Sequence, residues 1–183
     1  FGNNGRVITD IRNTKDYVKS VAIQQDGKII VFGYSELPFL SDQYDFVAVR
    51  YNINGSIDST FNGTGIRIID FGYDGRASCM IIQPDGKIIF GGYARPVYTS
   101  LNQYYSIARY NTDGSFDDNF SGDGKQLIYN FSGKVNAIDI QTDGKIIVGG
   151  TGKGLGLMRF QINGELDSTF GINGIVNIKV GDT

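Results

Sequence analysis

A seven-residue segment that recurs three times constrains the fold of this chain more than any other feature of the sequence. It reads Gln-Pro-Asp-Gly-Lys-Ile-Ile at 83–89 and returns, with one position changed, at 24–30 and 141–147. The Asp-Gly pair of each copy separates two apolar runs, which is the strongest short-range signal for a β-hairpin. Because the copies lie about 60 residues apart, the sequence predicts a repeat protein.

Each repeat is expected to contain four short strands. The first and second flank the Asp-Gly turn, the third precedes an Asn-Gly or Asp-Gly turn, and the fourth follows a Phe-x-x-x-Gly segment. By position in the repeat, the expected strands are 18–24, 77–83 and 135–141; 28–34, 87–93 and 145–150; 46–51, 106–110 and 155–160; and 66–70, 125–130 and 175–180. An extra copy of the fourth strand is expected at 6–11.

The repeats divide a single domain, residues 1–183, into 12–70, 71–130 and 131–183, with 1–11 as the tail strand of a preceding repeat. The length is sufficient for one domain with its own core. Since the sequence begins with Phe1 rather than Met, and starts and ends at equivalent points of the repeat, we interpret it as a processed product or a piece of a longer protein.

The second strand of each repeat is apolar on both faces. Ile29–Phe32, Ile88–Phe90 and Ile146–Val148 are uninterrupted apolar runs, and successive side chains of a strand point to opposite sides of its sheet. Such strands are covered on both sides, as they are in the stacked four-stranded sheets of a β-propeller. The predicted fold class is therefore all-β, with three four-stranded antiparallel repeats forming part of a β-propeller and an extra N-terminal strand.

Three repeats are too few to close such a ring, because a propeller usually has four or more blades. We therefore expect either further repeats of a longer chain or a homodimer that closes a six-bladed ring.

Charge and composition argue against several functions. The net charge is −2, with no block of like charge, which disfavours binding to nucleic acid or to anionic membranes. No apolar run approaches the roughly 18 residues of a membrane-spanning helix, so membrane insertion is not expected. The lone cysteine, Cys79, is expected to pack rather than react, because the chain has no histidine to activate it.

Each repeat also carries a longer motif in two parts. Ala-Ile-Gln-x-Asp-Gly-Lys-Ile-Ile-x-x-Gly is followed by Ala-Arg-Tyr-Asn-x-Asp-Gly-Ser-x-Asp-x-x-Phe, approximately matched at 22–33 with 48–65, at 81–92 with 108–124, and at 139–150 with 158–174. The third copy departs most, with Phe160, Gln161 and Glu165 in place of Tyr, Asn and Ser. The combined motif resembles the delta-60 repeat, a bacterial family of propeller-like repeats. The resemblance implies bacterial origin and placement in large secreted or cell-surface proteins, but no common activity.

The turns after the third strands carry oxygen-bearing side chains at alternate positions, which makes them candidate Ca²⁺ ligands: Asn52, Asn54, Asp58, Asn111, Asp113 and Asp117. Calcium takes about six to eight oxygen ligands, but the distal glutamate of an EF-hand loop is missing. The alternative is a turn whose side chains bond the local backbone. No other cofactor is expected.

One arginine occupies the same place in the third strand of every repeat. We expect each to bond an aspartate of its own repeat as part of the scaffold, in the pairs Arg50 with Asp58, Arg109 with Asp117, and Arg159 with Asp167. The alternative is a carboxylate-binding cluster as in sialidases, but the adjacent Asp and Gly of these turns lack the spacing of a sialidase Asp-box.

The connections between second and third strands, at 35–44, 94–103 and 151–154, differ most between repeats. Equivalent insertions lie on one side of a repeat array, often the binding side. The candidate anchors for a partner are the aromatic residues in or beside them: Phe39, Tyr44, Tyr98, Tyr104 and Tyr105. The alternative is that apolar residues fold back to cover the ends of the sheets: Leu37, Phe39, Val97 and Leu101.

The sequence thus favours a non-enzymatic structural or interaction module that presents these connections to a protein, a glycan or another copy of itself. One alternative is a glycoside-acting propeller enzyme, which needs two carboxylates about 5 to 9.5 Å apart in one cleft. Another is a surface repeat stabilised by Ca²⁺.

Overall fold

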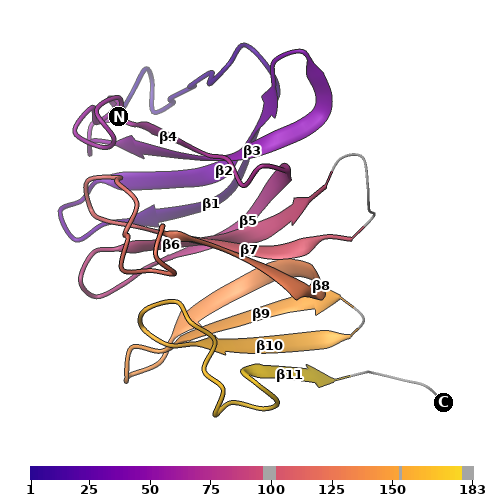
Figure 1. Ribbon diagram of the computed structural model, residues 1–183. Coiled ribbons are helices and arrows are strands. Elements are labelled where there is room, and N and C mark those ends of the chain that lie inside the picture. The colour runs from indigo at the N-terminus through magenta and orange to yellow at the C-terminus, as the bar shows by residue number, and fades with distance from the viewer. Residues whose placement is uncertain (97–101, 153, 179–183) are drawn as a thin grey trace.

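A computed structural model of the chain describes residues 1–96, 102–152 and 154–178. The strands of these residues are β1 (Asp16–Ile23), β2 (Ile29–Leu37), β3 (Leu40–Tyr51), β4 (Ile66–Ile69), β5 (Asp74–Ile82), β6 (Ile88–Arg95), β7 (Tyr104–Tyr110), β8 (Lys125–Ile140), β9 (Ile146–Gly152), β10 (Leu155–Phe160) and β11 (Ile175–Ile178). They form three antiparallel four-stranded units, here called blades, stacked one upon the next (Figure 1). The described residues include no helix that could cross a membrane. The all-β prediction is confirmed.

Each blade is a meander in which strands follow one another in chain order. Blade 1 contains β1–β4; blade 2 contains β5–β7 and the first part of β8; blade 3 contains the rest of β8 and β9–β11. In the first part of β8, Lys125–Ile128 and Ser132 pair with β7, whereas Gly133–Ile140 pairs with β9. Blades 2 and 3 therefore share one continuous strand where the sequence predicted two.

The link between blades 1 and 2 explains this difference. There the chain turns at Gly72, which has a φ of 76°, and the carboxylate of Asp70 accepts a hydrogen bond from the Gly72 amide at 2.5 Å. This local turn separates β4 from β5. The corresponding link between blades 2 and 3 remains extended, so its two predicted strands merge.

The predicted strand at 6–11 is wrong, because the described residues offer this segment no neighbouring strand to pair with. It runs over the face of blade 1 that is turned away from blade 2. There Val7 and Ile11 pack against Val47, Val49 and Tyr51. The last predicted strand begins as expected at Ile175, and its final two positions lie outside the described residues.

The core lies between the blades. On β6, Ile88 and Phe90 belong to the cluster shared with blade 1, whereas Ile89 belongs to the cluster shared with blade 3, and all three are fully buried. Burying a side chain of this size stabilises the fold by roughly 1.5 to 3 kcal/mol. The prediction that the second strand is covered on both faces is confirmed for this central blade.

An arginine joins each blade to the next at the end that carries the Asp-Gly turns. The guanidinium of Arg109 in blade 2 donates from Nη1 to the Ile162 carbonyl of blade 3 at 2.5 Å, and from Nε to Asp117 at 2.7 Å. Arg50 likewise donates to the Thr112 carbonyl of blade 2. The expected pairs with Asp58, Asp117 and Asp167 are all present, each at 2.7 Å.

A lysine that the sequence analysis did not single out completes each pair. It is the lysine of the recurrent segment, and its Nζ lies about 3 Å from the same carboxylate oxygen that the arginine contacts: Lys28 on Asp58 at 3.0 Å, Lys87 on Asp117 at 2.9 Å, and Lys145 on Asp167 at 3.0 Å. Its recurrence in all three copies was the available signal.

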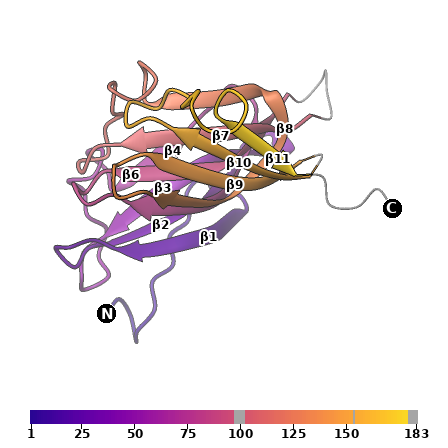
Figure 2. The ribbon, with the colours of Figure 1, turned by 90° about the horizontal axis from the view of Figure 1, so that it is seen from below.

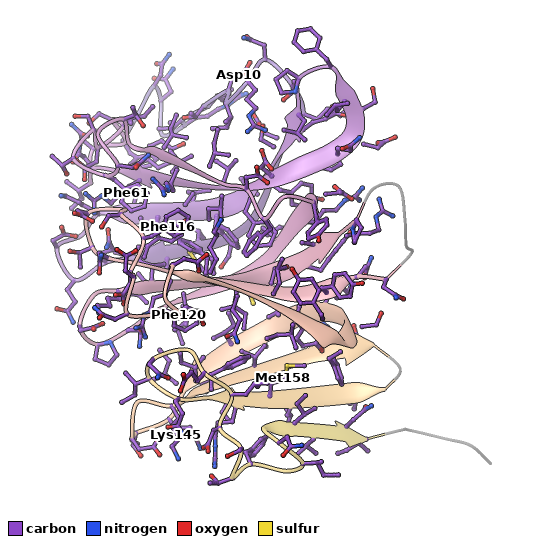
Figure 3. The ribbon with its side chains drawn as sticks, viewed as in Figure 1. Asp10, Phe61, Phe116, Phe120, Lys145 and Met158 are labelled. Carbon is purple, nitrogen blue, oxygen red and sulfur yellow. The ribbon has the colours of Figure 1, made fainter. Side chains whose placement is uncertain are left out.

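A phenylalanine packs beneath each junction arginine. The guanidinium of Arg50 lies 4.8 Å from the centre of the Phe61 ring, and that of Arg109 lies 4.8 Å from Phe120. These two rings lie one at each junction, at the same end of the blades (Figure 3). A Cβ atom on Gly114 of the next blade would come within 2.8 Å of the Phe61 ring, so only glycine permits this approach.

The junction contacts predict unequal effects of two equivalent substitutions. The Arg109 side chain is 3% exposed and bonds to two blades, whereas that of Arg159 is 19% exposed and bonds, among the described residues, only within blade 3. Arg109→Met should lower the free energy of unfolding by about 3 kcal/mol, and Arg159→Met by clearly less. Urea unfolding at concentrations low enough to keep the chain monomeric measures both, and equal losses there would show that the bond between blades contributes nothing.

Candidate functional site: the hairpin end of the blades

The end of the blades opposite the Asp-Gly turns, here called the hairpin end, carries the connections that vary most between repeats (Figure 1). In blade 1 the expected loop at 35–44 is instead a continuation of the sheet. Glu36 pairs with Tyr44 and Leu37 with Leu40, with a bulge between the two pairs. Only Pro38 and Phe39 form the turn. The loop prediction is wrong here because strand pairing continues almost to the tip.

Phe39 stands at the tip of this arm and is fully exposed. Its φ of 67° lies in the left-handed region, which a bulky residue adopts only with strain. The side chain does not fold back over the sheet, so for Phe39 the alternative of covering the blade ends is wrong. An exposed aromatic ring on a strained turn is the feature of this end that most resembles a contact point.

Three tyrosines pack together at the base of the arm. The Tyr17 and Tyr34 rings stack at 4.9 Å, and Tyr44 meets Tyr34 edge-on at 5.1 Å. Tyr44 is buried, and this burial raises the pKa of its phenol to about 12. The guanidinium of Arg76 from blade 2 lies 4.7 Å from the Tyr44 ring. Tyr44, predicted as a contact for a partner, therefore holds the arm in place.

Tyr17 is the exposed member of this cluster, and the sequence did not single it out as a candidate contact. It precedes the first predicted strand, which was expected to begin at 18. Its position opposite Tyr34 follows from the register of β1 against β2, which no local sequence signal specifies.

Buried ion pairs fix the arm to neighbouring segments. Asp45 accepts a hydrogen bond from Arg12 at 2.6 Å; burial raises the pKa of this carboxyl, and the Arg12 charge opposes the rise. Asp74 of blade 2 accepts from the Tyr44 amide at 3.1 Å and from Arg95 at 2.9 Å. The base of the arm is therefore bonded to the N-terminal segment and to blade 2.

Blade 2 places its predicted tyrosines in different surroundings. Tyr104 is half-buried and meets the exposed ring of Tyr129 edge-on at 5.1 Å. Tyr105 is fully buried against Phe131 in the core between blades 2 and 3, so its predicted role in binding is wrong: adjacent strand residues point to opposite faces. Tyr98 lies outside the described residues.

The candidate calcium turns, at the other end of the blades, use their oxygens internally. Asn54 Oδ1 accepts hydrogen bonds from the amide and hydroxyl of Ser56 at 3.0 and 2.8 Å, and Asn52 donates to the same hydroxyl at 3.0 Å. The second repeat has the same arrangement, formed by Asn111, Asp113 and Ser115. Across the described residues, no three acidic, cysteine or histidine side chains gather as a metal site would require.

The junction aspartates are held in their charged form. Burial opposes ionisation of Asp58, but hydrogen bonds from Thr60 and Lys28 outweigh it and hold the pKa of the carboxyl below its usual range. The pKa values of Asp117 and Asp167 are lowered by equivalent contacts, led in Asp167 by the hydrogen bond from Thr169.

Cys79 packs against the core between blades 2 and 3. Burial raises the pKa of its thiol to about 12, so the thiol stays protonated at neutral pH and is a poor nucleophile. The predicted packing role is confirmed.

The family model described as Domain of unknown function (DUF5122) beta-propeller matches residues 24–61, 83–120 and 141–170. Each matched segment runs from the Asp-Gly turn to the junction phenylalanine, and together they cover more than half of the chain. The match confirms that the stacked sheets are propeller blades. No curated protein matches the chain.

Removal of calcium is predicted to leave the fold unchanged. Because Asn54 and Asp113 already accept hydrogen bonds within their own turns, EDTA should not shift the melting temperature. Differential scanning fluorimetry with EDTA and with added CaCl₂ measures this. A melting temperature that rises with CaCl₂ would support the calcium alternative.

Acid is predicted to destabilise the fold through the junction aspartates. Their folded pKa values lie below the unfolded value of about 3.9, so below about pH 5 the unfolded chain binds more protons than the folded one. The free energy of unfolding should hold steady above this pH and fall continuously as the pH drops towards the folded pKa values. Thermal melts from pH 7 to pH 2 test the sign, and a melting temperature unchanged at pH 3 would contradict it.

Proposed function

Because the chain belongs to the DUF5122 beta-propeller family, we propose that it is a non-enzymatic interaction module that presents the hairpin end of its blades to a protein partner. The family description names a propeller and no activity, so the proposal rests on the hairpin end itself. The observation that carries it is the fully exposed Phe39 at the tip of a fixed arm.

The arm is suited to binding because it is ordered before any partner arrives. Its base is fixed by the tyrosine cluster and by the bonds of Asp45 and Asp74. Because the backbone of the arm is already held in place, little backbone entropy is lost when Phe39 enters a pocket. Large aromatic anchors of this kind carry most of the binding energy in protein interfaces.

A protein partner fits this geometry better than a glycan. Phe39 projects from a convex tip, whereas small-molecule and sugar ligands are held in concave sites. A projecting ring instead fills a pocket on a protein surface. Binding to a glycan is the alternative outcome of the experiment below.

An enzyme acting on glycosides is the other class of function. It would require two carboxylates at a catalytic separation in one cleft. At the hairpin end, Asp45 and Asp74 are engaged by Arg12 and Arg95, which supports a structural role for these acids. We also propose that the chain is a delta-60 repeat protein of bacterial origin, and that it is secreted or displayed at the cell surface.

Replacing Phe39 with glycine should separate stability from binding. Glycine adopts a positive φ without the steric penalty of a side chain, so Phe39→Gly should raise the free energy of unfolding by about 1 kcal/mol. The same substitution should weaken partner binding at least tenfold, as expected for an aromatic anchor. The matched control is Ile162→Ala, at an exposed position at the opposite end of the blades.

A photo-crosslinking amino acid at 39, compared with one at 162, identifies the partner in extracts of producing cells. The purified partner is then titrated against the wild-type chain and both variants by calorimetry, and a glycan array is run in parallel. Adducts specific to position 39, with affinity lost in Phe39→Gly and kept in Ile162→Ala, are expected. Equal affinity of all three chains would overturn the proposal, and binding on the array alone would favour the glycan reading.

A further inference from the structure

Every junction between blades joins two different faces, and one face of each kind has no blade against it among the described residues, although Val7 and Ile11 cover part of the face on blade 1. The leading face of blade 1 is the side turned away from blade 2, formed by alternate residues of β1, β2 and β3. The trailing face of blade 3 is the side turned away from blade 2, formed by β9, β10 and β11. Figure 1 shows these faces at the top and bottom of the stack, and Figure 2 looks onto the trailing face.

The trailing face exposes side chains that are core elsewhere. Leu155 and Leu157 of β10 are 56% and 42% exposed. Their counterparts in blade 2 are Tyr105 and Ile107, which are fully buried against blade 3. The apolar character of this face is therefore the character of a surface that another blade covers.

An arginine donor on the trailing face also lacks its usual acceptor. Arg159 bonds Asp167 through Nε at 2.7 Å and Thr169 through Nη2 at 3.1 Å. Its Nη1, the atom that Arg109 uses to reach the Ile162 carbonyl of the next blade, has no acceptor among the described residues. The trailing face is thus half of a junction.

The leading face of blade 1 is the other half. Val21 and Ile23 of β1 are 64% and 72% exposed, whereas their counterparts Met80 and Ile82 in blade 2 are half-buried. These side chains line an apolar groove of about 940 Å³. The Ile53 carbonyl, equivalent to the carbonyls that Arg50 and Arg109 reach, has no donor among the described residues.

The N-terminal segment lies where the outer strand of a preceding blade would lie. The Gly2 amide donates to the Asn54 carbonyl at 2.7 Å. The same bond crosses both internal junctions, from Asn62 to Asp113 at 2.7 Å and from Ser121 to Asn163 at 2.9 Å. Residues 6–11 therefore follow the course that the fourth strand of a preceding blade would take, but no third strand of such a blade is present among the described residues to pair with them.

The turn that opens this segment duplicates the turn that precedes β11. Gly2 and Gly171 have φ of 49° and 56°, and Asn4 and Asn173 have φ of 53° and 52°. In each turn one isolated antiparallel pair joins the two sides, Asn3 with Arg6 in the first and Ile172 with Ile175 in the second. At the internal junctions these glycines are replaced by Asn62 and Ser121. Residues 1–11 and 170–178 are thus alternative occupants of one structural position.

We propose that the leading face of blade 1 binds the trailing face of blade 3 of a second copy of this chain, and that residues 1–11 replace β11 as the outer strand of that copy's blade 3. The second copy is favoured because it supplies what each face lacks. Its trailing face brings the Arg159 donor and the apolar strand β10, and its leading face brings the Ile53 carbonyl and the apolar groove. β11 is the element displaced because it holds β10 by only four residue pairs and has no bond to a following blade among the described residues.

The internal junctions define the register. Ala48 pairs with Arg67 in blade 1, so Leu157 of one copy lies opposite Val7 of the other, and Arg159 Nη1 donates to the Ile53 carbonyl. Two such contacts, related by a two-fold axis, join two copies into a closed ring of six blades, within the range of about four to eight found in propellers. This surface is separate from the hairpin end, so the proposal stands or falls independently of the proposed function.

The solution mass tests the association. Light scattering after size exclusion should give twice the 20.0 kDa of the single chain. Leu157→Glu, which places a charge on the exposed trailing face, should halve the mass while the chain stays folded by circular dichroism. Phe39→Glu is the matched control, since it places the same charge on an exposed apolar position at the hairpin end, and it should remain a dimer. A wild-type monomer at all concentrations overturns the proposal, as does a Leu157→Glu dimer.

Cross-linking tests the exchange of strands. In a Cys79→Ser background, Val7→Cys with Leu157→Cys should form a disulfide between chains on oxidation, visible as a covalent dimer under denaturing conditions. The pair Leu157→Cys with Val176→Cys, which are opposite one another within one chain, should cross-link less in the dimer. A dimer that forms only the 157–176 link within each chain would overturn the replacement of β11.

Discussion

The structure depends on one interaction that is repeated from blade to blade: an arginine that bonds an aspartate of its own blade and a backbone carbonyl of the next. Arg109 makes both bonds while almost fully buried, above the ring of Phe120. A buried guanidinium is tolerated only when its charge and its donors are satisfied, and here the second set of bonds comes from a neighbouring blade. The charges pair within one repeat, but the remaining guanidinium donor finds its acceptor only in the next repeat.

This dependence gives the two ends of the blades different roles. The junction end repeats the same residues because each bond there has to be made again at the next blade. The hairpin end is free of this constraint, and the three connections differ in length and in aromatic content. Rigid scaffolds commonly carry function on such variable connections, and the arm bearing Phe39 is ordered by contacts with Arg12 and Arg76 rather than by the repeat.

Local patterns predicted the elements that depend on local chemistry. The Asp-Gly turns, the third strands and the arginine–aspartate pairs were predicted correctly from residues close in sequence. The course of β8 was not, because its two halves belong to different blades and merge only when no turn separates them. The arm was expected as a loop, since strand pairing between residues as unlike as Glu36 and Tyr44 has no sequence signature. The direction of Tyr105 follows from alternation, but the face to which it points is fixed by blade 3.

The sequence by itself determined that this is a repeat of β-hairpins with a scaffold arginine and aspartate in each copy, because turn chemistry and apolar alternation act over a few residues. The tertiary structure decided which face of each strand became core and which side chains remained exposed. Both depend on the blade that lies alongside: the same position is buried in Ile107 and exposed in Leu157, since a described blade covers one and not the other.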